Sequence, residues 1–123
     1  MARRPGVAPP HRGEVYLVSF DPTIGAEIRK TRPALVIQND MANRWSPVTI
    51  VAAISSRSEE RVYQTKVPLD PPEGKLDNPS VVLLNQIRTV DRRRLVRRLG
   101  RLRPESMRRV DRAIRISLGL AGV

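Results

Sequence analysis

Residues Val48–Ile54 form a nearly continuous apolar run, Val-Thr-Ile-Val-Ala-Ala-Ile. Ser46-Pro47 precedes the run and Ser55 follows it. An apolar segment of this length between polar boundaries is typical of a strand that is buried on both faces. We therefore expect Val48–Ile54 to be the central strand of a β-sheet.

Short apolar segments on either side of this run predict its partner strands. Glu14–Phe20 and Pro33–Gln38 precede it, and Tyr63–Leu69 follows with the alternation of an edge strand. The remaining candidates are Ser80–Leu84, Gln86–Val90, which polar Asn85 and Gln86 separate from the strand before it, and Leu95–Leu102.

Turn-forming residues predict the connections between these strands. Asp21–Thr31 is expected to be a long loop, and loops of this length are uncommon unless they carry function. The segments Asn39–Asn43, Ser55–Arg61 and Glu73–Pro79 are interpreted as turns or loops. Asp91–Arg94 is interpreted as a short helical turn.

The C-terminal segment has helical periodicity. Pro104 suits a first helical turn, and the apolar residues that follow it recur at helical spacing: Met107, Val110, Ile114 and Leu118. This predicts one amphipathic helix over residues 104–119. The fold class is therefore α+β and mainly β, a small barrel-like antiparallel sheet with a C-terminal helix. Residues 1–11 are interpreted as a disordered basic tail, and residues 12–123 as the folded domain.

Composition indicates a polyanionic partner and a cytoplasmic protein. The net charge is +11, from 23 Lys and Arg against 12 Asp and Glu, and such a surface attracts nucleic acid or an acidic protein. The chain has no cysteine, which suits a reducing compartment. We find no apolar run long enough for a membrane span and no signal peptide.

Several catalytic chemistries are disfavoured by the residues present. His11 is the single histidine and lies in the predicted tail, so a histidine-based triad or ribonuclease pair is not expected. The carboxylates are scattered rather than at metal-ligand spacing, and we predict no metal and no cofactor. RNA, however, carries its own nucleophile, the 2′-hydroxyl. A protein that aligns it and stabilises developing phosphate charge with arginine needs little else.

A succession of motifs resembles the MazF/PemK family of toxin ribonucleases from about Arg12 to Leu120. The motifs, in order, are Arg12–Tyr16, Gly25–Ile28, Thr31–Asp40, Asn43-Arg44, Val51–Ser55 and Val82–Asp91. No single motif is decisive, but their order and spacing together are specific.

The resemblance implies an SH3-like barrel with a C-terminal helix, usually a homodimer. It implies sequence-selective, metal-independent cleavage of single-stranded RNA, which leaves 2′,3′-cyclic phosphate and 5′-hydroxyl ends. It further implies an acidic, MazE-like antitoxin partner and DNA binding by the toxin–antitoxin complex. The catalytic residues that it implies are Arg32, of the Arg-Pro pair, and Ser55, at the end of the central strand, where many members carry threonine.

Further residues are candidates for RNA binding: Glu27, Arg29, Lys30, Thr31, Asn39, Trp45 and Gln86. Asn39 and Gln86 either read base edges or satisfy turn backbone. Trp45 and Phe20 are candidates for stacking on unpaired bases, although Phe20 fits the core equally well.

Two other functions also fit the composition. The first is a toxin of the gyrase-poison (CcdB) type, which shares the architecture and acts by binding a protein. The second is a basic nucleic-acid-binding barrel without enzymatic activity, which explains the charge but not the motif order.

Overall fold

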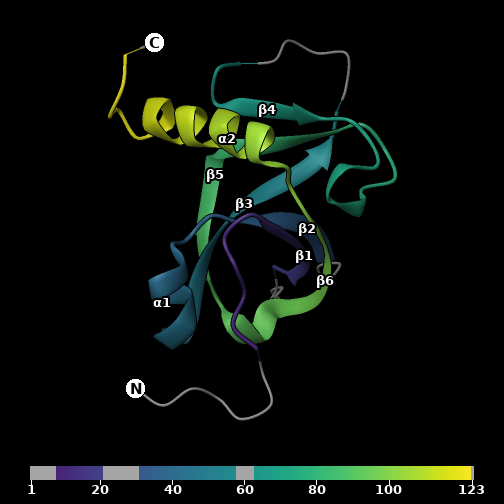
Figure 1. Cartoon of the computed structure of the whole chain (residues 1–123), viewed down its shortest axis with the longest axis vertical. Coiled ribbons are helices and arrows are strands. Elements are labelled where there is room, and N and C mark those ends of the chain that lie inside the picture. Colours follow the sequence, from purple (N-terminus) through teal and green to yellow (C-terminus); the bar gives the residue numbers. More distant parts are fainter. Residues whose placement is uncertain (1–7, 21–30, 58–62, 123) are drawn as a thin grey trace, which may run out of the picture.

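The structure is a computed structural model that describes residues 8–20, 31–57 and 63–122. In these residues the strands are β1 (Glu14–Ser19), β2 (Thr31–Val36), β3 (Val48–Ser56), β4 (Lys66–Leu69), β5 (Ser80–Asp91) and β6 (Leu95–Arg101). The helices are α1 (Asp40–Trp45) and α2 (Pro104–Ser117), and the 3₁₀ turns are η1 (Glu73–Lys75) and η2 (Arg92–Arg94). Figure 1 shows their arrangement.

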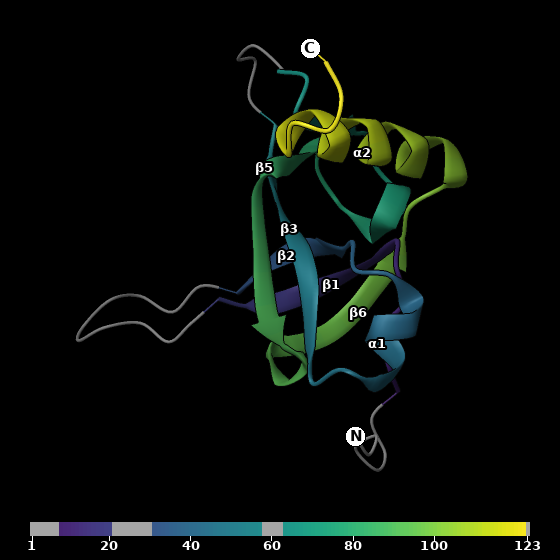
Figure 2. The same cartoon turned by 90° about the vertical axis from the view of Figure 1, so that its left-hand side faces the viewer.

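The six strands form one antiparallel sheet in the order β4-β5-β3-β2-β1-β6. The prediction that Val48–Ile54 is central is confirmed, because β3 pairs with β2 on one side and β5 on the other. The edge position predicted for the strand at Tyr63–Leu69 is also confirmed. The sheet curls on itself (Figure 2), but β4 and β6 are not paired, so the barrel is not fully closed by hydrogen bonds.

The prediction of two separate strand pieces at 80–84 and 86–90 is wrong. Ser80–Asp91 is one strand of 12 residues. Its pairing with β3 shifts between Ala52, opposite Ile87, and Ala53, opposite Leu83. A bulge absorbs the polar residues there and bends the strand instead of ending it.

The turn predicted at Asn39–Asn43 is also wrong, because Asp40–Trp45 forms the helix α1. The Asn39 side chain accepts a hydrogen bond from the Ala42 backbone N–H at 2.8 Å and thereby caps the helix. Asparagine is common both in turns and at helix N-caps, and here the capping role applies.

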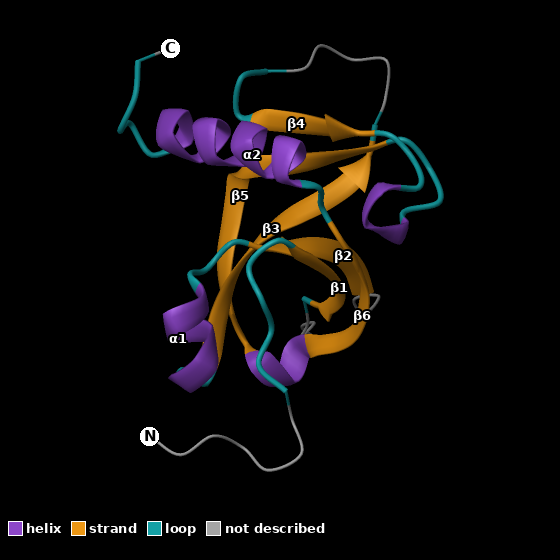
Figure 3. Ribbon diagram, in the orientation of Figure 1, coloured by secondary structure: helices purple, strands orange, loops and turns teal. Residues whose placement is uncertain are grey.

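The core consists of two apolar clusters separated by the curled sheet. The larger one joins Val15, Leu35 and Leu84 of the sheet to Val110 and Ala113 of α2. Helix α2 lies across β4 and β5 (Figure 3). Met107, Val110 and Ile114 of its predicted apolar face pack at this cluster, but the prediction is wrong for Leu118, which follows the helix and is exposed. The smaller cluster contains Val18, Ala34, Val36, Val51 and Val90.

The turn η1 packs against β6 on the open side of the sheet. A Cβ atom on Gly100 would lie 2.8 Å from the carbonyl carbon of Gly74, so only glycine permits this approach. The expected tail to residue 7 and most of the expected loop, residues 21–30, lie outside the described residues. Within the described residues, no helix is long and apolar enough to cross a membrane.

Candidate active site

Arg32 lies at the start of β2 with its side chain exposed. It lines a hollow of about 210 Å³ together with Phe20, Ala53, Gln86 and Arg88. The β1–β2 register fixes its position, because Arg32 pairs with Val18, which is fully buried. The buried Val18 thus holds the backbone of Arg32 in place, while the Arg32 residue itself is exposed.

Ser55 is half-buried near the C-terminal end of β3. The pairing of β2 with β3 runs from Val36 opposite Val51 to Ala34 opposite Ala53. Because the two strands are antiparallel, Arg32 near the start of β2 and Ser55 near the end of β3 lie at the same end of the strand pair.

Arg32 and Ser55 nevertheless line different hollows. The hollow at Ser55 has a volume of about 320 Å³ and includes Pro33 and Ile54 in its wall. It shares no lining residue with the hollow at Arg32. Successive residues of a strand point to opposite faces of the sheet, so Arg32 and Pro33 line hollows on opposite faces of β2, both at the end of the strand pair where Ser55 lies.

Gln86 is exposed at the bulge of β5 and lies beside Arg32 in the same hollow. Arg88 follows two residues later and also lines the hollow, and its guanidinium carbon lies 5.1 Å from the centre of the Phe20 ring. Our sequence analysis did not select Arg88. The period-two alternation of a strand, applied from Gln86, would have found it.

Phe20 is in the core position considered from the sequence, and its predicted stacking on a base stays a prediction. It packs against the smaller core cluster and also forms part of the wall beside Arg32. Thr31 is exposed next to Arg32 and pairs with Ser19.

The other predicted RNA-binding residues lie elsewhere. Asn39 caps α1, and Trp45 lies exposed at the end of α1, with the Arg44 guanidinium 5.1 Å from its ring. Neither of them lines the hollows at Arg32 and Ser55. Glu27, Arg29 and Lys30 lie outside the described residues.

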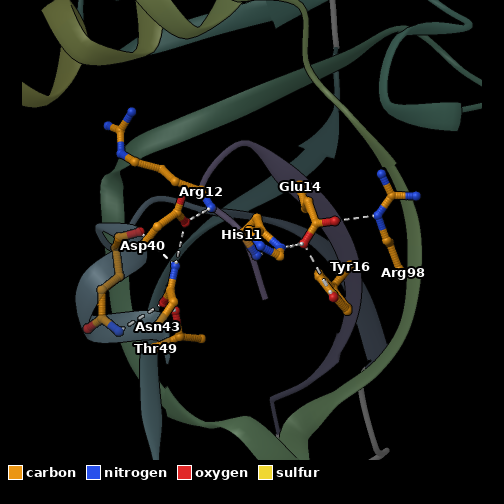
Figure 4. A network of polar contacts seen from close by, with 9 residues as sticks. His11, Arg12, Glu14, Tyr16, Asp40, Asn43, Thr49 and Arg98 are labelled. Carbon is orange, nitrogen blue, oxygen red and sulfur yellow. Dashed lines mark hydrogen bonds and ion pairs between the residues drawn. The ribbon is translucent and has the colours of Figure 1, made fainter. Parts of the chain in front are cut away.

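Glu14 on β1 organises a polar network on the barrel wall (Figure 4). Its carboxylate accepts hydrogen bonds from the His11 backbone N–H at 2.6 Å and from Arg98 Nε at 2.5 Å, and the Tyr16 hydroxyl lies 3.4 Å away. Burial and the Glu14 charge raise the pKa of Tyr16 above its ordinary value, against the opposing effect of Arg98. The ion pair between Glu14 and Arg98 neutralises the charge of Arg98. In residues 8–20, 31–57 and 63–122, no group of histidines and carboxylates could hold a metal ion.

Residues 11–118 match the family model for the PemK-like, MazF-like toxin of type II toxin-antitoxin systems. The chain belongs to this toxin family. It is 44% identical over 109 residues to the Bacillus subtilis (strain 168) protein Endoribonuclease EndoA, with 89% of this chain and 94% of that relative covered. The resemblance found from the motifs is confirmed, as is the prediction of an endoribonuclease toxin.

Solved structures of MazF-type proteins have the same fold. The MazE-MazF structure (Form-II) from Deinococcus radiodurans matches with a TM-score of 0.78 and 25% identity, over 94% of this chain and all of that one (100%). An endoribonuclease in complex with its cognate antitoxin, from a mycobacterial species, matches with a TM-score of 0.76 and 24% identity, over 93% and 99%. The predicted fold class, a barrel-like sheet with a C-terminal helix, is confirmed for this MazF/PemK-type toxin.

Proposed function

We propose that this MazF/PemK-type endoribonuclease toxin cleaves single-stranded RNA, without a metal, where the ends of β2 and β3 meet. The observation that supports the proposal is that Arg32 and Ser55 lie at the same end of the antiparallel strands β2 and β3. Arg32 supplies an exposed cation there, and Ser55 supplies a hydroxyl group.

In the proposed reaction the 2′-oxygen of the RNA attacks the adjacent phosphorus. The 2′-O–P bond forms and the P–5′-O bond breaks, while the 2′-hydroxyl loses its proton to water and the 5′-oxygen gains one from water. The products are a 2′,3′-cyclic phosphate and a 5′-hydroxyl. The Arg32 guanidinium stabilises the charge on the phosphate oxygens and donates hydrogen bonds toward the leaving oxygen, since arginine stays cationic at every working pH. The Ser55 hydroxyl adds one more donor.

The hollow beside Arg32 suits a base next to the scissile phosphate. Phe20 offers an aromatic ring for stacking, and Gln86 offers a donor and an acceptor to a base edge. Arg88 sits over that ring and places a second cation in the wall. The residues that the sequence predicts as further RNA contacts remain part of the proposal: Glu27, Arg29, Lys30, Thr31, Asn39 and Trp45.

Replacement of Arg32 by alanine tests the proposal. We expect Arg32→Ala to lower the single-turnover cleavage rate of a single-stranded oligoribonucleotide by about 10²–10³, with an unchanged melting temperature, since one charge-stabilising donor is removed. The exposed Arg112→Ala on α2 is the matched control and should cut at the wild-type rate. Wild-type cleavage should persist in excess chelator. Unchanged cleavage by Arg32→Ala would exclude the catalytic assignment, and toxicity without any cleavage would favour a toxin of the gyrase-poison type.

We further propose that the toxin is a cytoplasmic homodimer held inactive by an acidic, MazE-like antitoxin. The net charge of +11 supports an acidic partner, and the Deinococcus radiodurans relative was solved as MazE-MazF. An antitoxin that covers Arg32 should inhibit cleavage competitively with RNA. Sedimentation of the free toxin and of the mixture measures both assemblies.

A further inference from the structure

The hollow at Ser55 continues into a larger one between η1 and β6. This second hollow has a volume of about 660 Å³. Lys75 and Leu99 line both hollows, so the two hollows adjoin each other and form one continuous depression. It begins at Ser55 and extends along the open side of the sheet, where η1 packs against β6.

A row of paired residues connects β6 with the cleavage site. Arg97 pairs with Leu17, which pairs in turn with Pro33, the neighbour of Arg32. All three line the hollow at Ser55. Adjacent strands lie about 4.8 Å apart, so Arg97 is only about 10 Å across the sheet from β2. Arg97 and Ser55 line the same hollow, so an RNA strand held at Ser55 would reach Arg97 within a few nucleotides.

Three cations of this depression have no ion-pair partner in the part of the chain that the structure describes: Lys75, Arg97 and Arg101. Two neighbouring cations, Arg98 and Arg103, do have ion-pair partners. Arg98 Nε is 2.5 Å from Glu14 Oε2, and Arg103 Nη2 is 3.4 Å from Glu73 Oε1. The charge available to a ligand therefore comes from the first three residues.

The carboxylates of the depression do not cancel this charge. Glu73 is paired with Arg103, and Asp70 accepts a hydrogen bond at 2.5 Å from Arg57. Asp77 also lines the hollow at Ser55, and among described residues it has no ion-pair partner. Within the described segments, three cations and one carboxylate of the depression have no ion-pair partner, which leaves the depression positive.

We propose that Lys75, Arg97 and Arg101 bind the backbone phosphates of RNA nucleotides that flank the cleaved bond. This inference rests on the proposed function and extends its site. The ligand class follows from the lining: none of the exposed large apolar side chains, which include Trp45 and Val96, lines either hollow. A protein partner needs such apolar anchors for affinity, whereas a polyphosphate needs spaced cations.

The test uses the triple variant Lys75→Gln, Arg97→Gln, Arg101→Gln. Its matched control is Arg108→Gln, Arg112→Gln, Arg115→Gln, which removes the same charge from exposed positions on α2. Each protein is assayed with two RNA oligonucleotides that contain one mapped cut site, one minimal and one extended by several nucleotides on both sides. The readouts are KM, kcat and the slope of log KM against log salt concentration, with circular dichroism as a check on folding.

We expect the triple variant to raise KM for the extended RNA about tenfold, to leave kcat unchanged, and to leave the minimal RNA unaffected. Its salt slope should fall by about 2, since each phosphate contact on a single strand contributes about 0.7. Equal losses in the α2 control, or equal KM values for both RNA lengths, would overturn the phosphate track. So would normal RNA kinetics combined with weaker binding of an acidic peptide, which would assign the surface to a protein. Absence of cleavage by the wild-type protein would instead count against the proposed function.

Discussion

At the scale of single residues, Arg92 is distinctive because its guanidinium is buried with few partners. The residue is 7% exposed, and its Nε and Nη2 atoms have no hydrogen-bond partner in the described part of the chain. Among the described residues, its one side-chain hydrogen bond is from Nη1 to the Ser46 carbonyl oxygen at 3.4 Å. Burial of a charge without compensation opposes folding.

Arg92→Met should therefore stabilise the protein, because methionine fills similar space without a charge. We expect the free energy of unfolding in urea to rise by about 1–3 kcal/mol. Arg108→Met, exposed on α2, controls for the lost charge and should change stability by less than about 0.5 kcal/mol. A clear loss of stability in Arg92→Met would mean that the buried charge is compensated.

At the scale of elements, a buried network attaches α1 to β3 (Figure 4). The fully buried Asn43 side chain accepts hydrogen bonds from the Thr49 hydroxyl at 2.7 Å and from Gln38 Nε2 at 2.9 Å. It also donates to the Gln38 carbonyl oxygen at 2.9 Å. A helix as short as α1 is not stable alone, so these contacts and the Asn39 cap hold it in place.

Substitutions at Asn39 separate its capping role from RNA binding. Asn39→Ala should lower the free energy of unfolding by about 1 kcal/mol, whereas Asn39→Asp should keep the cap and the stability. Capping alone predicts wild-type cleavage by Asn39→Asp. If that variant folds normally but cuts RNA with an altered base preference, then Asn39 reads a base as well.

At the scale of the whole molecule, Glu73 joins the open side of the sheet to α2. Its carboxylate accepts a hydrogen bond from the Arg103 backbone N–H at 3.0 Å, and Arg103 begins α2 as its N-cap residue. Burial raises the pKa of Glu73, but hydrogen bonds from Ser106 and Arg103 outweigh it, so the pKa is lowered overall. One carboxylate thus connects η1, the end of β6 and the terminal helix.

The lowered pKa fixes the direction of a pH effect. A carboxylate with a lower pKa in the folded state stabilises the fold above its unfolded pKa, about 4.3, and this contribution is lost as pH falls through the folded pKa. Glu73→Gln should thus unfold about 1–3 kcal/mol more easily at pH 7. Urea titrations across pH should show this difference shrink below about pH 4. A difference that stays constant with pH would contradict a role for the charge.

The sequence by itself determined the central position of Val48–Ile54, the C-terminal helix and the family, because these depend on local periodicity and on motifs read along the chain. It also identified Arg32 and Gln86, which share one hollow. Only the tertiary structure decided that Ser80–Asp91 is one bulged strand and that Asn39 caps a helix, since both outcomes depend on which partner a polar residue finds. Pairing between strands far apart in the chain also brought Arg88 to Arg32 and left Arg97 and Arg101 of β6 without an ion-pair partner among the described residues, and no local pattern specifies such contacts.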